Sequence, residues 1–259
     1  MKTLSITKFP PLEYACSEAI NTLCTNISFS RENVKIIMIT SCQASEGKSF
    51  LAMNVMRAMT KLGKKVALVD ADMRGSALNS KYGIRLPNGK EDKGLAHLLS
   101  GNAKEDEVIY KTDIEGAYMV PIGRSVPDAL FLLTSPHFKS LLDALASQMD
   151  YVVVDAPPVN VVIDAAEIAK SCDGVIFAVS YNRIHRRELI DAKEQIEQTG
   201  CPILGTVLNQ VDYEEYLGRN YYYKSYYHNH YYSDRHYNKT ASVDKSGGKT
   251  PEDNGRRSE

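Results

Sequence analysis

The chain has 259 residues, which suits one α/β domain with an appended segment and is long enough to bury a sizeable core. Its 31 Lys and Arg residues nearly balance 32 Asp and Glu residues, so no global charge attracts nucleic acid or anionic lipid. The five cysteines lack a CxxC pair and no apolar run approaches the roughly 20 residues of a bilayer span, so we expect a reduced, soluble, cytoplasmic protein.

Strand and helix patterns alternate along the first 210 residues. We expect strands at 34–40, 65–69, 117–120, 151–154, 175–179 and 203–208. A helix at 12–27 precedes the first strand, and the helices between the strands are expected at 48–62, 94–99, 135–148, 165–171 and 186–198. Strands this apolar are buried on both faces. The pattern therefore predicts a doubly wound, mainly parallel sheet with helices on both faces.

The composition changes after Gln210. Ten of the 16 tyrosines fall between Tyr213 and Tyr237, at neither helical nor strand spacing, and polar residues lie between them. From Ala241 onward almost nothing apolar remains. We therefore expect residues 212–259 to be a disordered tail.

The loop after the strand at 34–40 ends in Gly47-Lys48-Ser49, directly before a predicted helix. Backbone N–H groups of such a loop cradle phosphates, the lysine reaches the outer phosphates and the serine hydroxyl binds Mg²⁺. Cys42 stands where the standard pattern has glycine, so the placement between strand and helix carries the prediction. The alternative is a chance Gly-Lys-Ser at a helix start.

Aspartates follow two other predicted strands: Asp70 and Asp72 after the strand at 65–69, and Asp155 after the strand at 151–154. Ligands of open α/β sheets bind at the carboxyl ends of the strands, so the three carboxylates can converge on Mg²⁺ and a terminal phosphate. A single aspartate at a strand end is more often a helix cap or a turn residue. Three of them beside Gly-Lys-Ser argue against that reading.

Together these motifs resemble those of the bacterial protein-tyrosine kinases that control capsule and exopolysaccharide synthesis. CQASEGKS at 42–49, ALVDADMR at 67–74 and VVVDAPP at 152–158 are similar to the Walker A, A′ and B motifs of that family, which shares the P-loop fold of MinD and ParA ATPases. MinD and ParA carry an additional lysine where Gln43 stands. The resemblance implies an N-terminal segment and helix at 1–30 that could pack subunits, a P-loop kinase domain at 31–211 and the tyrosine-rich tail at 212–259.

The resemblance also implies site residues, with ATP as donor and Mg²⁺ as cofactor. The implied nucleotide-binding residues are Ser45, Glu46, Gly47, Lys48, Ser49, Phe50, Arg74 and Asn209; the metal-binding residues are Ser49, Asp70 and Asp155; the catalytic residues are Lys48, Asp70, Asp72 and Asp155. Asp70 and Asp72 lie near the position of the incoming phenol, so either could accept its proton. A surface salt bridge for Arg74 and a turn role for Asn209, instead of an adenine contact, are the alternatives.

The implied activity is autophosphorylation of the tail between subunits, which regulates polysaccharide synthesis and export. The expected phosphoacceptors are Tyr221, Tyr222, Tyr223, Tyr226, Tyr227, Tyr231, Tyr232 and Tyr237. The family further implies a membrane-bound activator of the polysaccharide co-polymerase type, which recruits the kinase to the inner face of the membrane, and a tyrosine phosphatase. No nucleic-acid partner is expected, because residues 212–259 carry eight charges of each sign.

One departure from the family concerns the assembly of subunits. Glu18, Asn21 and Cys24 align with a Glu-x-x-Arg-x-x-Arg signature that packs subunits into a ring, and both arginines are missing. Asparagine and cysteine cannot form the forked contacts of arginine, so a homo-oligomer is expected without certainty of a ring. The alternative functions are a MinD- or ParA-like regulatory ATPase and a weakly active scaffold.

Overall fold

The computed structural model describes residues 1–30, 33–89, 92–124, 126 and 128–211. Met1–Gln210 form one compact unit. The predicted tail and its expected phosphoacceptors lie outside the described residues: Tyr221, Tyr222, Tyr223, Tyr226, Tyr227, Tyr231, Tyr232 and Tyr237. Within the described ranges, no helix combines the length and apolarity that a bilayer span requires.

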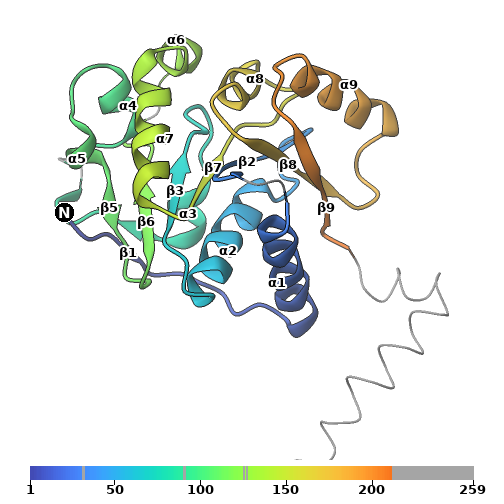
Figure 1. Ribbon diagram of the computed structural model, residues 1–259, viewed down its shortest axis with the longest axis horizontal. Coiled ribbons are helices and arrows are strands. Elements are labelled where there is room, and N and C mark those ends of the chain that lie inside the picture. Colours follow the sequence, from blue (N-terminus) through green and yellow to red (C-terminus); the bar gives the residue numbers. More distant parts are fainter. Residues whose placement is uncertain (31–32, 90–91, 125, 127, 212–259) are drawn as a thin grey trace, which may run out of the picture. The chain divides into compact units, whose positions relative to one another are not determined.

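A seven-stranded sheet forms the centre of this unit, in the order β5-β6-β3-β7-β2-β8-β9 (Figure 1). Its strands are β2 (Ile36–Ser41), β3 (Val66–Asp70), β5 (Tyr110–Lys111), β6 (Ala117–Val120), β7 (Tyr151–Asp155), β8 (Gly174–Ser180) and β9 (Ile203–Asn209). Every pair is parallel except β5 with β6 at one edge. The predicted mainly parallel sheet is confirmed, and the six expected strands all form.

Helices cover both faces of the sheet, as predicted (Figure 1). One face carries α1 (Tyr14–Ser28), α2 (Lys48–Lys61) and α3 (Leu78–Tyr82); the other carries α4 (Leu95–Leu99), α5 (Glu105–Val108), α6 (Ala129–Leu133), α7 (Pro136–Gln148), α8 (Asp164–Ala169) and α9 (Arg186–Glu197). Successive strand residues point to opposite faces. In β2, Ile37 and Ile39 pack under α1 and α2, whereas Met38 packs under the other layer.

Several short elements do not follow from the sequence pattern. These are α3, α5, α6, β5 and a separate two-stranded antiparallel sheet of β1 (Ser5–Ile6) and β4 (Ile84–Arg85). Segments of two to five residues are too short to show a period. Their backbone is fixed by distant partners, such as the Leu4 N–H that donates to the Lys111 carbonyl at 2.9 Å.

Helix α1 packs on α2 and buries Ile20, Cys24 and Ile27. The Cys24 side chain is fully buried, with Sγ 4.0 Å from the Val55 carbonyl oxygen of α2. Asn21 is exposed and its Nδ2 donates to Glu18 Oε1 at 3.1 Å. Of the two positions that carry arginine in the related signature, only Asn21 therefore faces outward, and Cys24 is covered by the chain's own core.

Candidate active site

The predicted catalytic residues meet at one edge of the sheet, where β2, β3 and β7 end. Strand β7 lies between β2 and β3, and Asp155 is in register with Asp70 of β3 on one side and Ile39 of β2 on the other. Parallel strands end at the same edge, so both carboxylates lie beside the loop that follows β2. The Ala156 N–H donates to the Ile39 carbonyl at 3.0 Å and fixes this arrangement.

The loop between β2 and α2 has a conformation that requires glycine at position 47. Ser45 and Gly47 have φ values of 66° and 95°, in the left-handed region. A Cβ atom on Gly47 would also collide with Nδ2 of Asn209. Asn209 lies there because its Nδ2 donates to the Glu46 carbonyl at 2.9 Å, which leaves Oδ1 and the second N–H of Nδ2 for its predicted adenine contact.

Glu46 holds this loop in place through its side chain, which is 2% exposed. Its carboxylate accepts hydrogen bonds from the backbone N–H of Gln43 and of Ser180, the latter at 2.9 Å. Gln43 in turn donates from Nε2 to Glu188 of α9 at 3.0 Å. Glu46 was predicted to bind nucleotide, and this geometry leaves only its backbone for that role.

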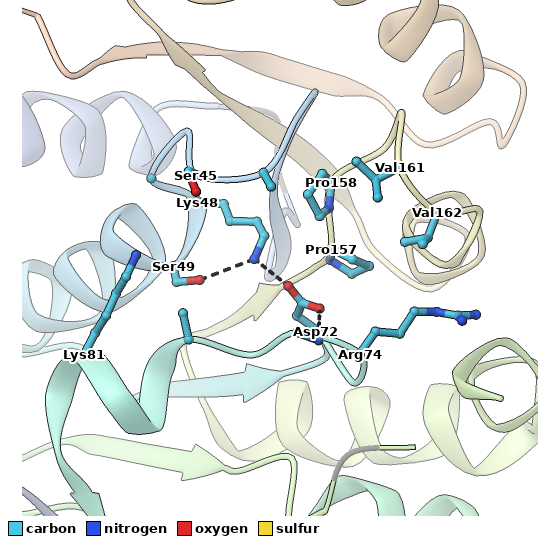
Figure 2. Close-up of a pocket in the computed structure, with 14 residues that line it drawn as sticks. Ser45, Lys48, Ser49, Asp72, Arg74, Lys81, Pro157, Pro158, Val161 and Val162 are labelled. Atoms are coloured by element: carbon cyan, nitrogen blue, oxygen red, sulfur yellow. Dashed lines mark hydrogen bonds and ion pairs between the residues drawn. The ribbon is translucent and has the colours of Figure 1, made fainter. Parts of the chain in front are cut away.

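A charged centre lies at the start of α2. Lys48 Nζ is 2.6 Å from Asp72 Oδ2 and 3.4 Å from Ser49 Oγ (Figure 2). It also lies 4.0 Å from Asp155 Oδ1. All four residues are buried. The pKa of Lys48 is raised: burial lowers it, but the carboxylates of Asp155 and Asp72 outweigh that effect. Lys48 is therefore a buried cation next to a cluster of carboxylates.

The carboxylates behind Lys48 have more oxygens than the described residues can satisfy. Both oxygens of Asp155 and Oδ1 of Asp70 are buried without a hydrogen-bond partner among the described residues, while Asp70 Oδ2 accepts from the Ser76 hydroxyl. Burial raises the pKa of Asp155 to about 6 against the opposing effect of Lys48. Burial and the nearby Asp155 raise the pKa of Asp70 well above its usual value.

These oxygens fit a magnesium site. Mg²⁺ prefers one or two carboxylates, waters and phosphate oxygens to an all-protein cage. The Asp155 carboxylate beside the Ser49 hydroxyl supplies that donor set, and a bound cation would offset the burial of the carboxylate. The described part of the chain holds no group of three or more His, Cys, Asp or Glu arranged for a metal, so phosphate oxygens would have to complete the site.

Because the pKa of Asp155 is raised, we predict that the stability of the chain without nucleotide and metal depends on pH. Its pKa rises from 3.8 to about 6 on folding, so between these values the folded chain binds more protons than the unfolded chain. The contribution of Asp155 to the free energy of unfolding should therefore fall by about 3 kcal/mol as the pH rises through this range. Urea unfolding at several pH values measures the difference in the free energy of unfolding between the wild type and Asp155→Asn. A difference that does not change with pH would contradict the prediction.

A pocket of about 370 Å³ opens over the charged centre (Figure 2). Its lining comprises Ala44, Ser45, Gly47, Lys48, Ser49, Asp72, Arg74, Gly75, Ala77, Lys81, Pro157, Pro158, Val161 and Val162. Arg74 forms a forked ion pair with the buried Asp164, at 2.6 Å from Nε to Oδ2 and 3.0 Å from Nη2 to Oδ1. Arg74 therefore forms a salt bridge, but its partner Asp164 is buried at the start of α8 and does not lie on the surface.

Several residues of the site were not predicted. Lys81 of α3 lines the pocket, and within the described chain its side chain forms no ion pair. Three other residues form hydrogen bonds with predicted ones: the Ser76 hydroxyl donates to Asp70, and the Ser180 N–H donates to Glu46. Glu188 accepts from Gln43. No sequence motif marks these residues. The predicted Phe50 is half-buried on α2 beside Ser49, and its carbonyl accepts from Asn54 at 2.8 Å.

The chain is similar in sequence to proteins of known family. The AAA domain family matches residues 34–198. Tyrosine-protein kinase CpsD of Streptococcus agalactiae serotype III is 37% identical over 195 residues, which are 75% of this chain and 82% of that protein. The chain belongs to the bacterial tyrosine-kinase family. Tyrosine-protein kinase CpsD of Streptococcus pneumoniae is 35% identical over 82% of this chain and 92% of its own length.

The kinase domain of the Escherichia coli tyrosine kinase ETK shares the fold, with a TM-score of 0.70 at 26% identity over 75% of this chain and 75% of that one. The chimerical protein CapA2B2 superposes with a TM-score of 0.71 at 33% identity, over 80% of this chain and 92% of that one. MinD of Pyrococcus horikoshii, solved with Mg-ADP, has a TM-score of 0.57 at 23% identity over 69% of this chain and 71% of its own, and shows the fold alone. The chain is thus a bacterial tyrosine kinase by family, on a sheet related to that of MinD.

Proposed function

We propose that the chain is an ATP- and Mg²⁺-dependent protein-tyrosine kinase that phosphorylates the tyrosines of its own C-terminal segment between subunits. Through this reaction it regulates capsular or exopolysaccharide synthesis and export. The observation that carries the proposal is the buried centre of Lys48, Asp72 and Asp155 beside a phosphate-binding loop. Relatives of the chain are named tyrosine-protein kinases, which supports tyrosine as the acceptor. The ten tyrosines between Tyr213 and Tyr237 are the candidates for this role.

The donor phosphates bind at the start of α2. The backbone N–H groups from Ser45 to Ser49 point at the phosphates, and the Lys48 ammonium neutralises the charge on the outer two. Ser49 and Asp155 would hold Mg²⁺, Asp155 through water, and the bound cation would supply charge neutralisation during phosphoryl transfer. Lys81 adds a further positive charge to the same pocket.

Asp72 is the better candidate to receive the phenol proton. The acceptor oxygen forms a bond to the γ-phosphorus, the bond from phosphorus to the bridging oxygen breaks, ADP leaves, and the phenol proton passes to a carboxylate. Asp72 lines the pocket, whereas Asp70 is fully buried and bonded to Ser76.

Partners follow from the family. We propose a membrane-bound activator of the polysaccharide co-polymerase type that brings the kinase to the inner face of the membrane, and a tyrosine phosphatase that reverses the reaction. Each phosphate adds nearly two negative charges to a segment that carries eight charges of each sign. Modification of several tyrosines would therefore repel neighbouring tails and loosen an assembly of subunits.

Transfer between subunits predicts that an inactive chain is labelled by an active one. One chain carries Lys48→Met and all its tyrosines; the other is active but has its eight expected acceptors replaced by phenylalanine. Incubation of the mixture with labelled Mg-ATP should place phosphotyrosine on the Lys48→Met chain, located by mass spectrometry. Each chain alone is the control. Phosphate release without phosphotyrosine in the wild type would instead support the regulatory ATPase.

A further inference from the structure

The mouth of the active-site pocket carries an exposed apolar surface that phosphate chemistry does not explain. Val161 and Ile163 are 55% and 64% exposed, and Val162 lies half-buried between them. Val161 and Val162 line the pocket with Pro157 and Pro158. We call these four lining residues, Pro157, Pro158, Val161 and Val162, the apolar wall. Apolar groups that line a pocket beside polar ones are typical of a ligand site.

The apolar wall is held rigidly against the phosphate-binding loop. The Val159 N–H donates to the Ser41 carbonyl at 2.8 Å, and the Asn160 N–H donates to the Cys42 carbonyl at 3.1 Å. The Asn160 side chain also donates from Nδ2 to the Glu188 carbonyl at 2.8 Å. These bonds fix the position of the wall relative to the site of the donor phosphates.

The other end of the same segment is fixed to the loop that bears Asp72. Asp164 directly follows Ile163 and forms the forked ion pair with Arg74, two residues beyond Asp72. The wall is therefore attached at one end to the loop for the donor and at the other end to the proposed base. A group that rests on the wall takes a defined position between them.

The two sides of the pocket suit different chemical groups. Figure 2 shows Pro157, Pro158, Val161 and Val162 on one side of Lys48, together with the Arg74 side chain that is paired with Asp164, and Ser45, Ser49 and Lys81 on the other, with Asp72 between the two sides. The polar side suits phosphate. The apolar side suits a flat apolar group whose polar tip reaches Asp72, which describes the ring and hydroxyl of tyrosine.

We propose that Val161 and Val162 seat the aromatic ring of the acceptor tyrosine and position its hydroxyl at Asp72. The proposal rests on the proposed tyrosine-kinase function and names the residues that select the acceptor. Serine and threonine carry the hydroxyl one bond from Cβ and have no ring to rest on the wall. The valines are positioning residues, since they contact the ring and not the reacting atoms.

The test is the double variant Val161→Thr, Val162→Thr, which keeps the branched shape but replaces one methyl group of each side chain with a hydroxyl. With the full chain and a peptide that holds one tyrosine, kcat/KM for the peptide should fall about 10-fold, mainly through KM, because the ring loses its apolar contact. The affinity for Mg-ATP and the rate of phosphate release to water should stay unchanged. The conservative Val161→Ile, Val162→Ile variant should keep wild-type kcat/KM.

The matched control is Leu62→Thr, at the far end of α2. Leu62 is 58% exposed, close to the 55% of Val161, but α2 has 14 residues and places it about 20 Å from Lys48. An unchanged KM for the peptide in the double variant Val161→Thr, Val162→Thr would overturn the inference. A parallel fall of its nucleotide affinity or phosphate release would overturn it as well. A wild type that never labels the peptide would overturn the proposed function instead.

Discussion

Replacement of Lys48 with methionine is expected to lower phosphotyrosine formation by about 10³-fold or more. Lys48 is the one side chain that lies 2.6 Å from Asp72 and 4.0 Å from Asp155 in this centre, so its charge reaches both the proposed base and the metal site. Removal of a preorganised positive charge from a buried phosphoryl-transfer site costs several kcal/mol of transition-state stabilisation. The measurement is the initial rate of labelled phosphate transfer to tyrosine at saturating Mg-ATP.

The control is Lys61→Met, which removes an exposed lysine from the last turn of the same helix. It should leave transfer unchanged. Lys48→Met also removes the ion-pair partner of the buried Asp72, so we expect the free energy of unfolding to fall by about 2 kcal/mol or more. Circular dichroism must therefore show that the variant is still folded under the assay conditions. Undiminished tyrosine labelling in a folded Lys48→Met chain would contradict the proposed mechanism.

Asp155→Asn is expected to change activity and stability in opposite directions. Tyrosine labelling should fall by about 10²-fold or more and require a higher Mg²⁺ concentration, because the amide binds the metal poorly. Without nucleotide and metal, the variant should be more stable than the wild type above pH 6 by about 3 kcal/mol, because it removes a buried carboxylate without a hydrogen-bond partner among the described residues. Labelling assays and urea unfolding at pH 7.5 measure the two effects.

Asp173→Asn supplies the matched comparison. The Asp173 carboxylate is well bonded: Oδ2 accepts from the N–H groups of Lys35 at 2.9 Å and Ile36 at 2.7 Å. Its replacement should destabilise the chain by about 1 kcal/mol and leave catalysis unchanged. If Asp155→Asn destabilises the metal-free protein as Asp173→Asn does, the carboxylate at 155 contributes to folding, and its proposed metal role loses its structural support.

The central sheet and the meeting of the motifs could be predicted from sequence for one physical reason. Buried parallel strands are continuous apolar runs, and residues that follow them share one edge of the sheet. Lys48, Asp72 and Asp155 lie together because each follows such a run. The predicted nucleotide contacts of Phe50, Arg74 and Asn209 stay predictions.

The parts that could not be predicted depend on contacts between distant segments. The sequence does not distinguish Asp70 from Asp72, since both end the same apolar run. In the fold, Asp70 is the last residue of β3 and is fully buried, whereas Asp72 lies in the following loop and reaches the pocket. The bond from the Ser180 N–H to Glu46 spans 134 positions and leaves no local pattern.

The ion pair between Lys48 and Asp72 has a consequence for the order in which substrates can react. In this arrangement, the lysine that should bind the donor occupies the carboxylate that should take the acceptor's proton. Phosphate oxygens that attract Lys48 would release Asp72, so we expect the proposed base to become available only after the donor has bound. A tyrosine that enters an empty site would meet a carboxylate paired with lysine, and we therefore expect ATP to bind first and tyrosine second.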